Sequence, residues 1–319
     1  KKYIYENFRE GSQTLIEINL DSIMYLNLKN KVIFSQYGNE YLNSNKKEFE
    51  NYLIEKFMNL LISLLFALLP SLVLAQVVSV EFKEKGFLFS NEPTLTFVWP
   101  SPKAKTTLIF IPGGEGRIGL TPERKNIGGF YAATLKPLSD IKLTSGTFNV
   151  VLFDSPVNLP VGSGYAHSRQ GAEHLLRIES VVRHYKELYG QPVWLMGHSN
   201  GAASITEFYK MLQKKQQEQI VEGAIYSSAR NGSSFNDSTK LPILFLAHEK
   251  DGCPVSSPSM SRTVFEQHQK TNPMRTEYLV VKGGEAQAQH VCTSGFHMFY
   301  GAADEAYSAI DRFVQDDKK

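Results

Sequence analysis

A serine flanked by glycines marks the point where an apolar segment runs directly into an amphipathic one. The segment VWLMG at 193–197 is apolar, and residues 201–215 carry apolar side chains at three- to four-residue spacing. This periodicity predicts a buried strand followed at once by a helix. The sequence GHSNG between them leaves no room for a relaxed loop. A Gly-x-Ser-x-Gly turn between strand and helix holds the serine hydroxyl exposed on a strained backbone, which predicts that Ser199 is a nucleophile.

The glycines on either side of Ser199 have a steric role in this prediction. A side chain at Gly197 or Gly201 would collide with the neighbouring strand and helix. The turn also lies at a helix N-terminus, whose partial positive charge favours developing anions. A chance match in a glycine-containing loop is the alternative, and the placement between strand and helix argues against it.

A serine hydroxyl is a weak nucleophile unless a histidine takes its proton. His297 stands in the segment SGFHMFYGA, immediately before the last amphipathic pattern of the chain. From that loop an imidazole ring can reach back over the edge of the sheet. His268 falls inside a predicted helix and His290 in a glutamine-rich stretch, while His198 and His248 are interpreted as turn-lining and strand-end residues. We therefore predict that His297 is the general base.

The histidine in turn needs a carboxylate that fixes its tautomer. In proteins with a Gly-x-Ser-x-Gly turn between a strand and a helix, this acid lies after the serine and before the histidine along the chain. Asp251 follows the apolar strand ILFLAH directly, in the turn HEKDGCP. This places its carboxylate at the same sheet edge as Ser199. The other candidate carboxylates downstream of Ser199 are Asp237, Glu249, Glu285 and Asp304.

An acyl-transfer site also needs backbone N–H groups directed at the oxyanion. Asn200, the residue after the predicted nucleophile, should supply one of them. The other should come from the loop PGGEG that follows the strand at 107–111, where we favour Gly114, with Glu115 as the neighbouring candidate. A phosphate-binding loop is the alternative, but the chain has neither a GxGxxG motif nor a Walker lysine.

The chain has two cysteines, Cys253 and Cys292. Cys253 lies just after the predicted acid, and Cys292 lies shortly before the predicted base. A bridge between them would tie the acid loop to the base loop, and export to an oxidising compartment would permit it. We expect this disulfide, with two unrelated free thiols as the alternative. Two cysteines so far apart do not indicate a metal site.

The elements around these residues alternate between apolar strands and amphipathic helices. This alternation predicts an α/β fold: a mostly parallel twisted sheet with helices on both faces. The segment SARNGSSFNDSTKLP at 228–242 is short and polar, which predicts little or no lid. The predicted strands are 77–82, 94–99, 107–111, 148–153, 193–197, 220–227, 243–248 and 275–281; the predicted helices are 126–138, 172–189, 201–215, 259–269 and 301–314.

The overall composition is that of a globular protein. The chain has 319 residues, of which 42% are hydrophobic and 21% charged, with a formal charge of +2. This balance and the lack of a basic, aromatic-interleaved run give no indication of a nucleic-acid partner. The predicted chemistry requires no metal or organic cofactor. We expect a small-molecule acyl substrate, and the sequence does not indicate the oligomeric state.

The first part of the chain differs from the rest. Residues 1–57 are rich in Asn, Lys, Tyr, Glu and Ile, and MNLLISLLFALLPSLVLAQ follows at 58–76. The apolar core, the Pro-Ser break and the small residues before Gln76 are typical of a signal peptide over 58–75. We expect cleavage after Ala75, with 1–57 absent from the mature protein and 76–319 forming the hydrolase-like domain. The protein would then be periplasmic or secreted, without stable membrane association; an uncleaved signal anchor that tethers it to the membrane is the alternative.

The motifs IPGGEG, VWLMGHSNG, HEKDGC and CTSGFHMF occur in that order. Together they resemble the α/β-hydrolase superfamily of serine hydrolases over residues 77–315, and more narrowly exported bacterial α/β hydrolases with an HxxDxC acid turn. The resemblance implies the α/β-hydrolase fold and the triad Ser199, Asp251 and His297. The appended residues 1–57 depart from that pattern.

These features predict an exported serine hydrolase, in its simplest form a carboxylesterase for small acyl esters. A hydrolase of amide or thioester bonds is an alternative, because the sequence does not choose between these substrates or define the acyl chain. A non-catalytic binding protein on the same scaffold is another alternative, since a fold does not guarantee an activity.

Overall fold

The computed structural model describes residues 75–86, 89–124, 127, 146–156, 169–234, 239–272, 274–286, 291–293 and 295–316. Contacts divide the chain into the units Lys1–Leu72 and Val73–Lys319, and all described residues belong to the second. The expected N-terminal extension 1–57 and signal peptide 58–75 lie outside the described residues, except for Ala75. Of the predicted helix 126–138, only Ile127 is described.

One eight-stranded sheet organises the described residues, in the order β1-β2-β4-β3-β5-β6-β7-β8. The edge strand β1 pairs antiparallel with β2, and β2 pairs antiparallel with β4; the pairs from β4 through β8 are parallel. The sheet is therefore mostly parallel, as predicted. The strands are β1 Gln76–Val80, β2 Thr94–Trp99, β3 Thr106–Ile111, β4 Phe148–Asp154, β5 Val193–His198, β6 Gly223–Ser227, β7 Ile243–His248 and β8 Thr276–Val281.

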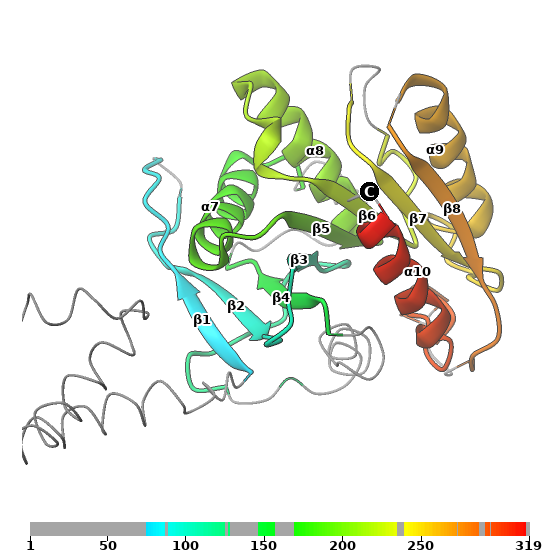
Figure 1. Ribbon diagram of the computed structural model, residues 1–319, viewed down its shortest axis with the longest axis horizontal. Helices are drawn as coiled ribbons and strands as arrows, with labels where there is room; N and C mark the ends of the chain where they lie inside the picture. Colours follow the sequence, from blue (N-terminus) through cyan, green and yellow to red (C-terminus); the bar gives the residue numbers. More distant parts are fainter. Residues whose placement is uncertain are drawn as a thin grey trace, which may run out of the picture. The chain divides into compact units, whose positions relative to one another are not determined.

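Helices cover both faces of this sheet (Figure 1). The α-helices are α7 Ala172–Tyr189, α8 Asn200–Lys215, α9 Pro258–Thr271 and α10 Ala303–Asp316, and the 3-10 helices are η1 Glu218–Ile220 and η2 Val291–Thr293. Apolar side chains of α7, α8 and α9 pack into one hydrophobic core on one face, and those of α10 pack into a second core on the other face. Strands β3 to β7 are buried throughout because both of their faces are covered.

One predicted strand begins later than its apolar pattern suggested. The pattern over 220–227 predicted a single strand, but β6 starts at Gly223, and the residues before it include the 3-10 helix η1. Ile220 and Val221 are buried in the core without pairing in the sheet. A short apolar run reports burial and does not by itself distinguish a strand from another buried segment.

The fold brings the chemically interesting loops to one edge of the sheet. Parallel strands present their carboxyl ends at the same edge, where α/β proteins bind ligands. At this edge Pro112 follows β3, Asp154 ends β4, Ser199 follows β5 and Asp251 comes shortly after β7. Between β6 and β7, the described residues 228–234 and 239–242 contain no helix.

Candidate active site

Ser199 occupies a strained turn between β5 and α8. Its backbone has φ 52° and ψ −117°, a left-handed φ that non-glycine residues rarely adopt. A Cβ atom at Gly201 would overlap the carbonyl oxygen of Ile111, and one at Gly197 would lie 2.6 Å from the nitrogen of Ala202. The close approach of β3, β5 and α8 therefore leaves no space for side chains beside the serine.

A histidine and a carboxylate form a buried pair next to this turn. Nδ1 of His297 lies 2.8 Å from Oδ2 of Asp251, and the two residues are 1% and 4% exposed. Oδ1 of Asp251 accepts a hydrogen bond from the backbone amide of Cys253 at 2.9 Å. The Ser256 hydroxyl lies 3.3 Å from the same Nδ1, and the Ser228 hydroxyl donates to the His297 carbonyl at 3.1 Å. Hydrogen bonds to the ring nitrogen and to the backbone carbonyl of His297 therefore fix the position of the imidazole ring.

One cavity of about 270 Å³ joins residues that the sequence analysis selected separately. Ser199 and His297 both line it, and Asp251 contacts His297 from behind. Residues of the loop after β3 line it as well. The lining residues are Gly113, Gly114, Glu115, Arg117, His198, Ser199, Cys292, His297 and Met298.

Asn200 begins α8 and is buried, with its side chain directed at the loop after β3. Its Nδ2 donates to the carbonyl of Gly114 at 3.1 Å. The Arg230 guanidinium donates to Oδ1 of Asn200 at 2.6 Å, which fixes the orientation of the side-chain amide. Asn200 therefore links the turn at Ser199 to Gly114, which lines the cavity together with Glu115.

His198 contributes a second imidazole to the cavity. Its ring centroid lies 4.7 Å from that of His297, and its Nδ1 lies 3.0 Å from the Ser227 hydroxyl. Burial lowers the pKa of His198 well below its usual value, and the His297 ring beside it lowers the pKa further. His198 is therefore neutral around pH 7, so it packs against His297 without adding charge.

The disulfide between Cys253 and Cys292 is present, with the two Cα atoms 4.5 Å apart. It joins the loop after β7, which carries Asp251, to the segment that precedes His297. Cys292 also lines the cavity that contains Ser199. The bridge therefore connects the two supports of the buried His297–Asp251 pair.

Sequence reasoning missed two buried charged residues that hold the loop after β3. Arg169 binds carbonyls of this loop, and Asp154 binds its amides. Asp154 could have been suspected, because it directly follows the apolar residues of β4 at the edge where ligands bind. No local pattern marks Arg169, whose partners on this loop lie more than 50 residues away in sequence.

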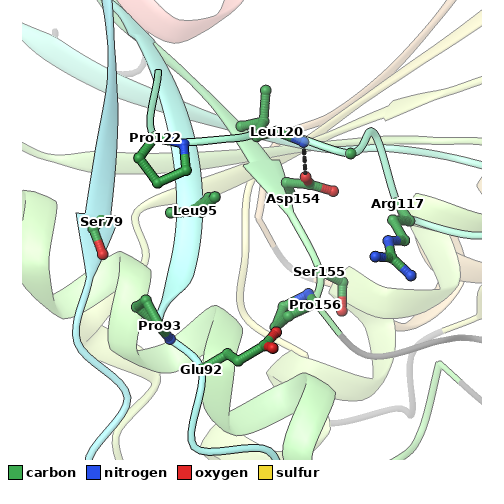
Figure 2. Close-up of a pocket in the computed structure, with 11 residues that line it drawn as sticks. Ser79, Glu92, Pro93, Leu95, Arg117, Leu120, Pro122, Asp154, Ser155 and Pro156 are labelled. Atoms are coloured by element: carbon green, nitrogen blue, oxygen red, sulfur yellow. Dashed lines mark hydrogen bonds between the residues drawn. The ribbon is translucent and has the colours of Figure 1, made fainter. Parts of the chain in front are cut away.

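Figure 2 shows the carboxylate of Asp154 beneath this loop, at a second cavity of about 260 Å³. Its oxygens accept hydrogen bonds from the amides of Ile118 and Leu120, each at 2.6 Å. Burial raises the pKa of Asp154, while these amides and the Arg117 charge act in the opposite direction. Arg117 lines both cavities, which lie along the same edge of the sheet. The second is lined by Ser79, Glu92, Pro93, Leu95, Arg117, Gly119, Leu120, Pro122, Asp154, Ser155 and Pro156.

This protein is similar to known proteins in its structure. The sequence matches no protein-family model, and no curated protein is similar to it in sequence. The carboxyl esterase 2 of the mycorrhizal fungus Tuber melanosporum is 12% identical with a TM-score of 0.52, and the match covers 76% of this chain and 86% of the esterase. A dienelactone hydrolase from Anabaena variabilis is 13% identical with a TM-score of 0.50, over 76% of this chain and 97% of that one. At these identities the likeness shows the fold alone. Together with the sheet order, it establishes that this chain has the α/β-hydrolase fold.

Proposed function

We propose that the protein is an exported serine hydrolase, in its simplest form a carboxylesterase that acts on small acyl esters. One observation carries this proposal: Ser199, on its strained turn, lines the same cavity as His297, whose Nδ1 is bound by the buried Asp251. A serine, a histidine and an orienting carboxylate are the groups that acyl transfer to water requires.

In the first half of the proposed reaction, His297 accepts the Ser199 proton while Oγ attacks the ester carbonyl carbon. The carbonyl electron pair moves onto oxygen, and the resulting oxyanion accepts hydrogen bonds from the amides of Asn200 and of Gly114 or Glu115. His297 then gives its proton to the departing alkoxide as the C–O bond breaks. An acyl-enzyme on Ser199 and a free alcohol result.

Water completes the proposed reaction by the same steps. His297 removes a proton from water as its oxygen attacks the acyl carbon, and it returns the proton to Oγ of Ser199 when the carboxylic acid leaves. Asp251 stabilises the imidazolium through Nδ1. His297 therefore accepts and donates every proton that the proposed reaction transfers.

Export is supported by the disulfide and by the sequence before it. Disulfides persist in oxidising compartments, and the Cys253–Cys292 bridge is compatible with one. The signal-peptide pattern over 58–75 also favours export to the periplasm or secretion. Within the described part of the chain, no helix has the length and apolar character needed to span a bilayer.

Covalent labelling tests the nucleophile directly. A fluorophosphonate probe should label the purified protein, and Ser199→Ala should abolish the labelling. The variant should also lose about 10⁴–10⁶-fold in kcat on p-nitrophenyl acetate, the usual cost of removing the nucleophile of such a unit. Ser308→Ala, on the exposed face of α10, should label and turn over like the wild type.

The alternatives give different results in the same assay. A binding protein without activity would neither label nor hydrolyse the ester. A hydrolase specific for amides or thioesters would label on Ser199, yet prefer a matched p-nitroanilide or thioester over the ester. Appreciable ester hydrolysis by Ser199→Ala would contradict the assignment of the nucleophile.

A further inference from the structure

Arg169 lies fully buried beneath the loop that follows β3, and its guanidinium binds three successive carbonyl groups there. Nη1 donates to the carbonyl of Pro112 at 3.0 Å. Nη2 donates to the carbonyls of Gly113 at 3.1 Å and Gly114 at 2.7 Å. The fork of N–H groups on one guanidinium can serve several acceptors at once, which a lysine ammonium does less well.

Fixing these carbonyls also fixes the amides of the next residues. A peptide unit is planar and trans, so its C=O and N–H point in opposite directions. When Arg169 holds the Gly113 carbonyl, the N–H of Gly114 is turned away from the guanidinium. When Arg169 and Nδ2 of Asn200 together hold the Gly114 carbonyl, the N–H of Glu115 is turned away in the same manner. The amides of Gly114 and Glu115 are the two candidates on this loop for donating a hydrogen bond to the oxyanion.

Gly114 has no side chain whose packing could hold that orientation. Gly114 has a left-handed φ of 52°, and a Cβ atom built on it would find no atom within 4 Å. Glycine backbones have the most conformational freedom in the unrestrained state. Hydrogen bonds to the carbonyls, including the turn bond from the Gly116 amide to the Gly113 carbonyl, therefore determine the peptide planes.

The guanidinium itself is held from the helix side. Nη1 donates to the Ser204 hydroxyl on α8 at 3.0 Å, and that hydroxyl lies 2.9 Å from Nε2 of His174 on α7. Burial lowers the pKa of His174 to about 3, and the charges of Arg169 and Arg177 contribute to the shift. A neutral imidazole thus lies beside the cation, and two helices anchor Arg169 against the loop.

We propose that Arg169 is a positioning residue for the oxyanion hole. It does not touch the substrate; it sets the peptide planes of residues 113–115 so that their amides face the reacting carbonyl. Its positive charge behind those carbonyls also polarises the same peptides in the direction that favours an anion. The inference rests on the proposed hydrolase function, and its test includes a readout that does not depend on turnover.

The kinetic test compares Arg169→Ala with Arg177→Ala. Arg177 is an equally buried arginine that binds the carbonyls of Ser90 and Glu92 and the carboxylate of Glu173 instead of the carbonyls of residues 112–114. Loss of an oxyanion donor costs about 10²–10³-fold in kcat. We expect a loss of this size in Arg169→Ala, with KM changed by less than about threefold, and no loss in folded Arg177→Ala.

Two further variants separate positioning from stability. Arg169→Lys, which keeps the charge but serves fewer carbonyls, should have a kcat between those of wild type and Arg169→Ala. Guanidinium ion, below the concentration that unfolds the variant, should restore part of the kcat of Arg169→Ala and none of any deficit in Arg177→Ala. Equal kcat losses in Arg169→Ala and Arg177→Ala, after correction for folded fraction, would overturn the proposal.

Crystal structures of wild type and Arg169→Lys give the readout that is independent of activity. We expect at least one of the peptides 113–114 and 114–115 to rotate in the variant, with the sheet unchanged. Unchanged peptide planes would overturn the positioning role, whether or not the wild type hydrolyses esters. Rotated planes in a wild type that hydrolyses no ester would support the role of Arg169 in holding the loop and reject the proposed function instead.

Discussion

Among single residues, Asp251 gives the most specific prediction, which concerns the effect of Asp251→Asn on kcat. Its Oδ2 accepts from Nδ1 of His297, so Asp251→Asn replaces a charged acceptor by an amide that favours the wrong tautomer of the ring. We expect kcat to fall about 10³–10⁴-fold, with KM little changed, as for loss of the orienting acid in other triads. Steady-state kinetics on p-nitrophenyl acetate measure the effect.

The matched control is another aspartate downstream of Ser199. Asp304 is exposed in the first turn of α10, and Asp304→Asn should leave kcat unchanged. Because Oδ1 of Asp251 also accepts from the Cys253 amide, thermal unfolding of Asp251→Asn should be recorded alongside the kinetics. If Asp304→Asn proved the more damaging substitution, the acid would be misassigned.

At the scale of elements, the disulfide connects the loop after β7 to the segment before α10. It closes a loop with a sequence separation of 39 residues. For a loop of about 40 residues, chain entropy gives roughly 4 kcal/mol of stabilisation in the ideal case. Its two ends adjoin Asp251 and His297, so its removal should loosen their relative placement before the sheet unfolds. A misplacement of about 1 Å can cost roughly a hundredfold in rate.

We therefore expect dithiothreitol, or the variant C253A/C292A, to lower kcat at temperatures where circular dichroism still reports native structure. Mass spectrometry of unreduced protein should recover the two cysteine peptides linked. A decline of kcat only in step with global unfolding would mean that the bridge acts on stability alone. Free thiols at both positions in protein from an oxidising compartment would contradict the bridge itself.

At the scale of the whole molecule, buried histidines predict how stability depends on pH. Burial lowers the pKa of His268 to about 4 and that of His174 to about 3, and it lowers that of His198 well below the usual value. The unfolded chain binds these protons near pH 6.5 and the folded chain does not. The contribution of these neutral histidines to the free energy of unfolding is thus complete above about pH 6.5. It is lost as the pH falls from there toward the pKa values of the histidines in the folded protein. For His268 and His174, the loss in the free energy of unfolding should reach about 2 kcal/mol each by pH 5.

Urea unfolding at pH 7, 6 and 5 measures this dependence. His268 gives a specific variant, because its Nε2 lies 2.6 Å from Nδ2 of Asn272 and the ring contacts Phe245. His268→Gln should reduce the slope of the unfolding free energy against pH by up to about one proton, or 1.4 kcal/mol per pH unit. An unchanged slope in His268→Gln would show that this ring is not neutral in the folded protein.

The sequence alone predicted the elements and their order well, because strand and helix periodicity depends on near neighbours along the chain. Strand β2 and helix α7 have the predicted bounds, and the glycine-flanked serine marked the turn between β5 and α8. The start of β6 was wrong because Ile220 is apolar through burial and not through sheet pairing. The disulfide followed from the positions of its cysteines next to the two candidate residues.

Other features depend on the tertiary structure, because they join residues far apart in the chain. The pairing of His297 with Asp251 spans 46 residues, and Arg169 reaches the Pro112 carbonyl across 57. Local pattern selected Asp251 and His297 as candidates, but it does not show that two distant side chains touch, and it did not mark Arg169. These contacts form because the parallel strands β3, β4, β5 and β7 place their carboxyl ends at one edge, where Arg169, which precedes α7, and Asn200, which begins α8, bind the loop after β3. Residue types and their neighbours along the chain are enough to select candidates for catalysis, but which candidates come into contact depends on the order of the strands in the sheet.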